Sequence, residues 1–119
     1  MTVSEYFVYA IGAALVDTEI DVSDNDLDQL SIEKGMMTLV DEARQAEIKN
    51  HLSHKLSSAN HACGGSAGNS VIAASQFGAP TYMSCLVAND EDGDIYIKDL
   101  EACGVDHGFK SERRFPYRQ

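Results

Sequence analysis

The sequence has little of several residue types that whole classes of protein depend on. It contains no tryptophan, two prolines and only nine lysines and arginines, against 19 aspartates and glutamates in 119 residues. The resulting formal net charge of −10 disfavours a general nucleic-acid-binding role, because phosphate backbones are bound through clustered basic side chains. No apolar run is long enough to span a membrane, and no basic segment followed by an apolar one opens the chain. We therefore expect a cytoplasmic protein with neither nucleic acid nor membrane as a partner.

Cysteine is also scarce, and its spacing excludes the common cysteine motifs. The three cysteines, Cys63, Cys85 and Cys103, form no C-x-x-C pair, which disfavours a zinc knuckle and a dithiol redox site. His51 and His54 could share a helix face near Cys63, but helical histidines are more often exposed or capping residues. Reduced structural thiols are the favoured interpretation, and no metal site is predicted.

The residues that are present suffice for one folded domain. The hydrophobic fraction of 44% is too high for a disordered chain. A domain of this length buries roughly two-thirds of its unfolded surface. The charge is uneven, because residues 110–119 carry a net charge of +3 and the first 109 residues carry −13.

Alternating strand and helix patterns predict an α/β fold. Strands are expected within residues 6–11, 58–63, 81–87 and 105–109, and helices near residues 24–30, 41–55, 66–77 and 90–102. Strand, helix and strand at this spacing indicate right-handed βαβ crossovers and a parallel sheet. Residues 15–22 and 36–40 also have strand patterns but do not fit between these crossovers. We expect them to form a small antiparallel layer attached to the α/β core.

A glycine-rich turn in residues 63–70 (CGGSAGNS) lies where a predicted strand meets a predicted helix. Such a turn exposes backbone N–H groups and the positive end of the helix dipole, which suits a polar or anionic ligand. Its glycines allow close approach of the backbone, and Asn69 offers both a donor and an acceptor. The turn lacks the Gly-Lys-Ser/Thr ending of a Walker A loop and does not match G-x-G-x-x-G. A ligand-binding turn and a purely structural turn both remain open on this basis.

Two acidic clusters need comparison with calcium-binding loops. Residues 24–28 (DNDLD) begin like an EF-hand loop, but Gln29 takes the place of the required glycine and Gly35 that of the bidentate acid. Residues 90–94 (DEDGD) fail in the same way, because Ile95 takes the place of glycine. Both clusters are predicted to be solvated turns and helix caps.

Several short motifs occur together in one order along the chain. They are residues 12–17 (GAALVD), 34–41 (KGMMTLVD), 64–69 (GGSAGN), 77–78 (FG), Gly93 and 100–105 (LEACGV). With this set, residues 6–109 resemble the N-terminal portion of a ribokinase/PfkB family sugar or nucleoside kinase. The spacing from Asp17 to Gly64 is similar to that of the adenosine-kinase-like branch.

The resemblance implies a fold and a reaction. The fold would be a ribokinase-like parallel sheet with βαβ crossovers and a small antiparallel β lid, truncated here, with lid strands within about residues 15–22, 36–40 and 58–63. The reaction would be phosphoryl transfer from ATP, with Mg²⁺, to a hydroxymethyl group of a sugar or nucleoside.

The resemblance also implies roles for individual residues. Asp17 matches the acid that hydrogen-bonds vicinal sugar hydroxyls, as a carboxylate acceptor should. The residues that would also hold the sugar are Gly64, Gly65 and Asn69. Apolar lid contacts to a base or ring would come from Met37 and Leu39. Ala13 stands where many relatives have asparagine, so the identity of the sugar or nucleoside stays open.

The family's catalytic aspartate lies in a later Gly-Ala-Gly-Asp motif, which has no counterpart in this sequence. We therefore expect residues 1–109 to be the substrate-binding N-terminal part of such a kinase, inactive alone and without tight binding of ATP or Mg²⁺. The basic tail, residues 110–119, matches nothing in the family, and a frameshifted gene or a truncation would account for it. The alternative hypothesis is a non-enzymatic folded remnant or a self-associating module, with a homodimer formed through its lid strands or an open sheet edge.

Overall fold

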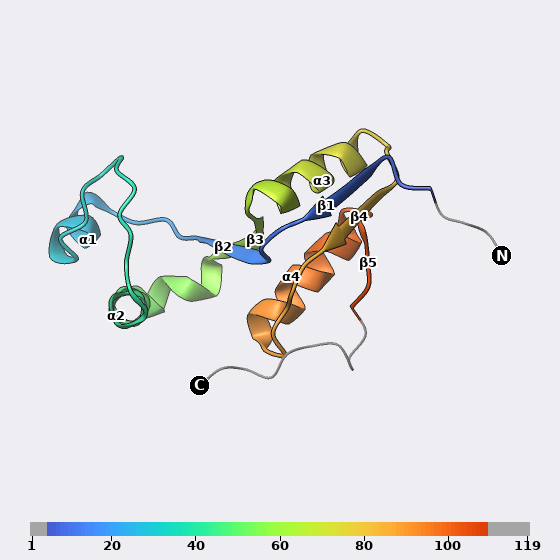
Figure 1. Cartoon of the computed structure of the whole chain (residues 1–119). Helices are drawn as coiled ribbons and strands as arrows, with labels where there is room; N and C mark the ends of the chain where they lie inside the picture. The colour runs from blue at the N-terminus through green and yellow to red at the C-terminus, as the bar shows by residue number, and fades with distance from the viewer. Residues whose placement is uncertain (1–4, 110–119) are drawn as a thin grey trace. The chain divides into compact units, whose positions relative to one another are not determined.

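The computed structural model describes residues 5–109, which divide into two compact units (Figure 1). The core unit contains the described residues up to Asp17 and those from His61 onward. The inserted unit is Thr18–Asn60. The basic tail predicted at residues 110–119 lies outside the described residues.

A three-stranded parallel sheet is the centre of the core unit. Its strand order is β1 (Val8–Ile11), β4 (Thr81–Ser84) and β5 (Asp106–His107). The register pairs β1 with β4 from Val8 opposite Thr81 to Ile11 opposite Ser84, and both strand pairs are parallel. Helix α3 (Ser66–Gln76) precedes β4, and helix α4 (Glu91–Ala102) lies between β4 and β5. The predicted α/β fold with a parallel sheet is confirmed, although each strand is shorter than its sequence pattern.

The hydrophobic core lies between the sheet and the two helices. Its most deeply buried side chains come from α3, β4 and α4, and they are Val71, Met83, Tyr96 and Leu100. Val8 and Ala10 of β1 pack against this cluster, whereas the alternate residues Tyr9 and Ile11 are exposed. This period of two places one face of β1 on the core and leaves the other face uncovered.

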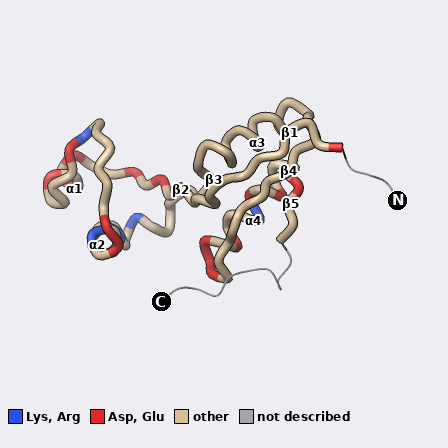
Figure 2. Tube along the Cα trace, in the orientation of Figure 1, with Lys and Arg blue, Asp and Glu red and all other residues tan. Residues whose placement is uncertain are grey.

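Local signals set the ends of both helices of the core unit. The Asp90 carboxylate accepts a hydrogen bond of 2.8 Å from the Gly93 N–H and caps α4. Acidic residues occupy the first turn of this helix (Figure 2), where their charges complement its dipole. Gly78, with a φ of +90°, follows the end of α3. The prediction that residues 90–94 cap a helix is therefore confirmed.

A second, two-stranded antiparallel sheet pairs β2 (Leu15–Glu19) with β3 (Asn60–Gly64). Strand β2 ends at Glu19, although the alternating pattern extends to Val22. A small antiparallel layer is thus present as predicted, but among residues 5–109 its second strand is β3 and not residues 36–40.

The inserted unit contains α1 (Asp24–Gln29), α2 (Glu42–His51) and the 3₁₀ helix η1 (Ser53–Ser58). Ser23 and Asp26 form a capping box at the start of α1, and Lys55 of η1 forms a 2.7 Å ion pair with Asp26. The hydrogen bonds from Lys55 and Ser23 hold the pKa of Asp26 well below its usual range. The acidic cluster at residues 24–28 is therefore a capped helix, as predicted.

The predicted strand over residues 36–40 is wrong. These described residues belong to no helix or strand, and the Met37 and Leu39 side chains are 86% and 88% exposed. A strand is stabilised by a paired neighbour and by burial of one face, and this segment has neither within the inserted unit. No described helix of either unit has the length and apolar character needed to cross a membrane.

Candidate functional site

The candidate site lies where strands β1 and β4 end and helix α3 begins. Ligands of open α/β sheets bind at the carboxyl ends of the parallel strands. Beyond the end of β1, the Gly12 N–H donates a hydrogen bond of 3.3 Å to the Ser84 carbonyl, which keeps the two strand ends together. The chain then continues through Ala13 and Ala14 into β2, which carries Asp17.

The glycine-rich junction connects β3 directly to α3. Gly64 is the last residue of β3 and is buried, and Gly65 occupies the N-cap position with a φ of +82°. Because no side chain caps α3, the amide groups of its first turn are available to a ligand. The predicted position of this turn, between a strand and a helix N-terminus, is confirmed.

The Asp17 carboxylate lies directly against Gly64. A Cβ atom added at Gly64 would lie 2.5 Å from both Cγ and Oδ2 of Asp17, which is closer than real Cβ contacts. Asp17 itself is exposed, so its oxygen atoms remain accessible to a ligand. The structure therefore places an accessible carboxylate, which can accept hydrogen bonds from hydroxyl groups, against the residue that leads into the start of α3.

The other sequence-predicted residues are placed differently. Asn69 lies in the first turn of α3 with an exposed side chain, and its backbone N–H donates to the Gly65 carbonyl at 2.9 Å. Met37 and Leu39 belong to the inserted unit, where both are exposed. The core unit thus brings together Asp17, Gly64 and Gly65, with Asn69 in the following turn.

Sequence reasoning did not find the cavity that lies next to this cluster in the core unit. The cavity has a volume of about 230 Å³, and its lining comes from residues 14–16 and 86–88 together with Asp90, Asp92, Gly93 and Tyr96. Tyr96 is 1% exposed, and its hydroxyl group has no hydrogen-bond partner among the described residues. Burial raises the pKa of this hydroxyl, so it is neutral at physiological pH. No local pattern connects residues 14–16 with residues 86–96, which are far apart in the sequence.

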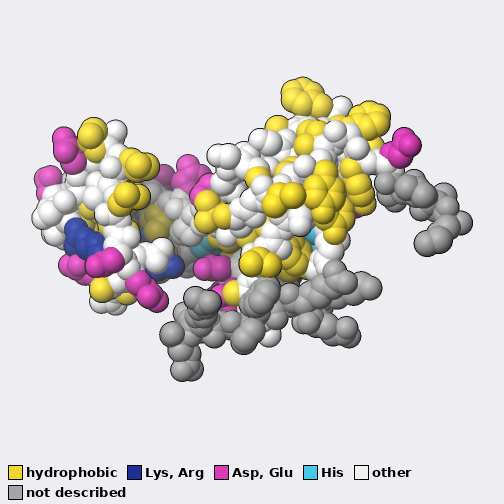
Figure 3. Space-filling model, viewed as in Figure 1, with side chains coloured by type: hydrophobic (Ala, Val, Ile, Leu, Met, Phe, Trp, Pro, Cys, Tyr) yellow, Lys and Arg dark blue, Asp and Glu magenta, His cyan; other side chains and the backbone are white. Residues whose placement is uncertain are grey.

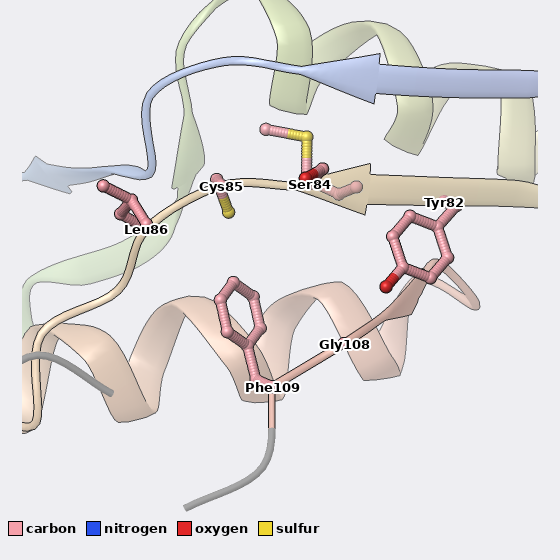
Figure 4. A pocket seen from close by; sticks show the side chains of 7 residues that line it. Tyr82, Ser84, Cys85, Leu86, Gly108 and Phe109 are labelled. Carbon is pink, nitrogen blue, oxygen red and sulfur yellow. The ribbon is translucent and has the colours of Figure 1, made fainter. Parts of the chain in front are cut away.

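A second cavity, of about 170 Å³, opens beside the end of β4 (Figure 4). The side chains of Tyr82 and Phe109 project into the space between β4 and residues 108–109. Cys85 lines the same cavity, and burial raises the pKa of its thiol. This cysteine is therefore protonated near neutral pH and is a weak nucleophile.

Cys63, immediately before the two glycines, is a structural residue. Its thiol is buried and donates a hydrogen bond of 3.2 Å to the Tyr96 carbonyl. Burial, together with the negative charge of Asp99, raises the pKa of the Cys63 thiol to about 12. Within residues 5–109, no three histidine, cysteine or acidic side chains are placed to hold a metal ion.

The sequence and the fold are both similar to those of known proteins. The sequence profile described as pfkB family carbohydrate kinase matches residues 30–112. A probable sugar kinase from Rhizobium etli is 31% identical, with a TM-score of 0.70 over 88% of this chain and 31% of its own. Adenosine kinase from Sinorhizobium meliloti is also 31% identical, with a TM-score of 0.72 over 96% of this chain and 33% of its own.

More distant structures share the fold alone. Adenosine kinase from Schistosoma mansoni in complex with adenosine is 21% identical, with a TM-score of 0.72 over 92% of this chain and 32% of its own. No curated protein matches the sequence significantly. The chain spans about a third of the length of each of these solved structures.

Proposed function

Because the chain belongs to the pfkB family of carbohydrate kinases, we propose that its core unit binds the sugar portion of a nucleoside or sugar that is phosphorylated on a hydroxymethyl group. The observation that supports this most directly is the Asp17 carboxylate against Gly64, at the uncapped start of α3. Solved relatives that are 31% identical include an adenosine kinase and a probable sugar kinase, so both substrate classes are retained.

The role proposed for each residue follows from the hydrogen bonds that its groups can form. Asp17 accepts hydrogen bonds from two neighbouring sugar hydroxyls, because an ionised carboxylate has only acceptor sites. The junction at Gly64 and Gly65 lets the sugar approach the backbone and the first turn of α3. The Asn69 amide supplies a further donor and acceptor. Met37 and Leu39 are proposed to contact the base or ring, as apolar side chains that the inserted unit leaves exposed.

ATP and Mg²⁺ are the cofactors that membership of this kinase family implies. The described residues offer no cluster of metal ligands, and the sequence has no Gly-Ala-Gly-Asp motif to supply the catalytic base. We therefore assign this chain the binding of the phosphoryl acceptor.

Isothermal titration of the chain with adenosine, inosine and ribose tests this function. Replacing Asp17 with alanine should weaken binding by roughly 10- to 100-fold, because a hydrogen bond to a charged group contributes about 1.5–3 kcal/mol. Asp17→Asn, which keeps the side-chain shape and one acceptor oxygen, should bind the ligands with an affinity between those of the wild type and Asp17→Ala. The matched control is Glu19→Ala, an exposed acid on the same strand, which should bind like the wild type. The proposal is wrong if the wild type binds none of the three ligands or if Asp17→Ala binds as well as the wild type.

The uncovered face of β1 favours a second candidate function, self-association. Strand β1 is at one edge of the three-stranded sheet, and the neighbouring side chains Phe7 and Ile11 are 77% and 78% exposed. Hydrophobic side chains gather over this part of the core unit (Figure 3). An exposed apolar edge strand is a template for pairing with a second copy of the chain.

Sedimentation of the purified chain at increasing concentration tests this second function. A dimer should form, and Ile11→Lys should shift the equilibrium to the monomer by placing a charge on the apolar edge. Phe77→Lys is the matched control, because Phe77 is also an exposed apolar residue but follows α3 rather than lying on β1. A wild-type chain that stays monomeric at every concentration would exclude self-association.

A further inference from the structure

Helix α4 holds the peptide that leads into the glycine junction. Oδ2 of Asp99 accepts a hydrogen bond from the backbone N–H of Cys63, with a distance of 2.6 Å between the nitrogen and oxygen atoms. This distance is slightly shorter than the range of about 2.7–2.9 Å that is typical of charge-assisted N–H bonds to a carboxylate. The bond joins residues 36 positions apart, and its donor lies one residue before Gly64.

A second contact from the same helix reinforces the first. The Cys63 thiol donates to the carbonyl of Tyr96, which precedes Asp99 by three residues and therefore lies on the same side of α4. Cys63 is buried and Asp99 is half-buried, so water competes little for these groups. One residue of β3 is thus held by α4 at both its backbone and its side chain.

The position of this peptide matters because Asp17 contacts the next residue. The space between the Gly64 backbone and the Asp17 carboxylate is too small for a methyl group. Any displacement of Gly64 toward β2 therefore moves Asp17, and any displacement away from it opens a gap under the carboxylate. The hydrogen bond at Cys63 limits both movements.

We propose that Asp99 is a positioning residue for the candidate site, fixing the Cys63–Gly64 peptide and, through it, the place of the Asp17 carboxylate. Its importance for ligand binding rests on the proposed function. The positioning itself requires no ligand, because it concerns the backbone at Gly64 and Gly65.

Two replacements of Asp99 separate positioning from general stability. Asp99→Leu removes the acceptor and leaves the Cys63 N–H without its partner. Asp99→Asn keeps a carbonyl oxygen within reach of the same N–H and removes only the charge. Lys98→Leu is the matched control, because Lys98 is the adjacent, exposed residue of the same helix.

Nuclear magnetic resonance of the ligand-free chain gives the first measurement. In Asp99→Leu, the amide resonances of Gly64 and Gly65 should shift much more than in Lys98→Leu, and Asp99→Asn should restore most of the difference. If Asp99→Leu does not fold, a comparison of the wild type with Asp99→Asn still tests the proposal. The Cys63 amide proton should resonate far downfield in the wild type and move upfield when the charge is removed. Unchanged resonances at Cys63, Gly64 and Gly65 would overturn the proposal.

Titration with adenosine and ribose gives the second measurement. Asp99→Leu should weaken binding roughly tenfold, a loss of about 1.4 kcal/mol, with Asp99→Asn close to the wild type. Equal binding by Asp99→Leu and Lys98→Leu would overturn the link to the ligand. A wild type that binds neither ligand would contradict the proposed function. The resonances of Gly64 and Gly65 would still test whether Asp99 positions this part of the backbone.

Discussion

Replacing Gly64 with alanine should reduce binding of adenosine or ribose by about 100-fold or more. The added Cβ would lie 2.5 Å from Cγ and Oδ2 of Asp17, so the carboxylate must leave its place or β2 and β3 must separate. Rotation of the exposed Asp17 side chain would cost little stability, whereas separation of β2 and β3 would cost about 1–3 kcal/mol, as overpacking does. Isothermal titration and thermal unfolding of the same samples measure the two effects.

Two further variants identify the cause of these losses. Ala62→Val adds carbon atoms at an exposed position of the same strand and should leave binding and stability close to wild type. The double variant Gly64→Ala/Asp17→Ala should recover most of the lost stability, because the clashing carboxylate is gone, without recovering binding. If Gly64→Ala binds ligand like the wild type, the contact between Gly64 and Asp17 has no part in recognition.

The parts of the fold that could be predicted are those set by local sequence. The Asp90 cap, the helix that ends before Gly78 and the apolar run of β1 are each determined by a few neighbouring residues, and the structure confirms all three. Residues 36–40 show where this reasoning fails. Their apolar side chains suggest a strand, but a strand requires a partner and a surface to bury them, and no local pattern reports whether either exists.

Most contacts of the candidate site could not be predicted either, because they join residues that are distant in the sequence. A glycine-rich turn before a helix was recognisable from residues 64–69 alone. The contact between Asp17 and Gly64 joins segments that are distant in sequence, and the family resemblance suggested only that both serve one ligand. The hydrogen bond from Cys63 to Asp99 had no sequence signal, because an acid within a helix is most often simply solvated.

Replacing Gly93 with alanine should strongly destabilise the core unit, although alanine is the better helix former. Gly93 is a buried residue in the first turn of α4, and a Cβ added there would overlap the Ala88 carbonyl oxygen and lie 2.8 Å from Cγ1 of Val87. A backbone oxygen cannot rotate away as a side chain can, so the start of α4 must shift. The gain in helix propensity is about 1 kcal/mol, whereas overpacking against a backbone oxygen should cost about 3 kcal/mol, and loss of the hydrogen bond from the Gly93 N–H to the Asp90 carboxylate would add about 1 kcal/mol.

Thermal unfolding followed by circular dichroism measures this effect. A net loss of about 2 kcal/mol should lower the melting temperature by about 8 °C in a chain of this length. Lys98→Ala, at an exposed position of the same helix, should leave the melting temperature nearly unchanged, since it introduces alanine without a clash. Because Val87, Ala88 and Gly93 also line the 230 Å³ cavity, the same shift should change the cavity's shape. If Gly93→Ala melts at or above the temperature of Lys98→Ala, the close approach of α4 to residues 87–88 does not exist in solution.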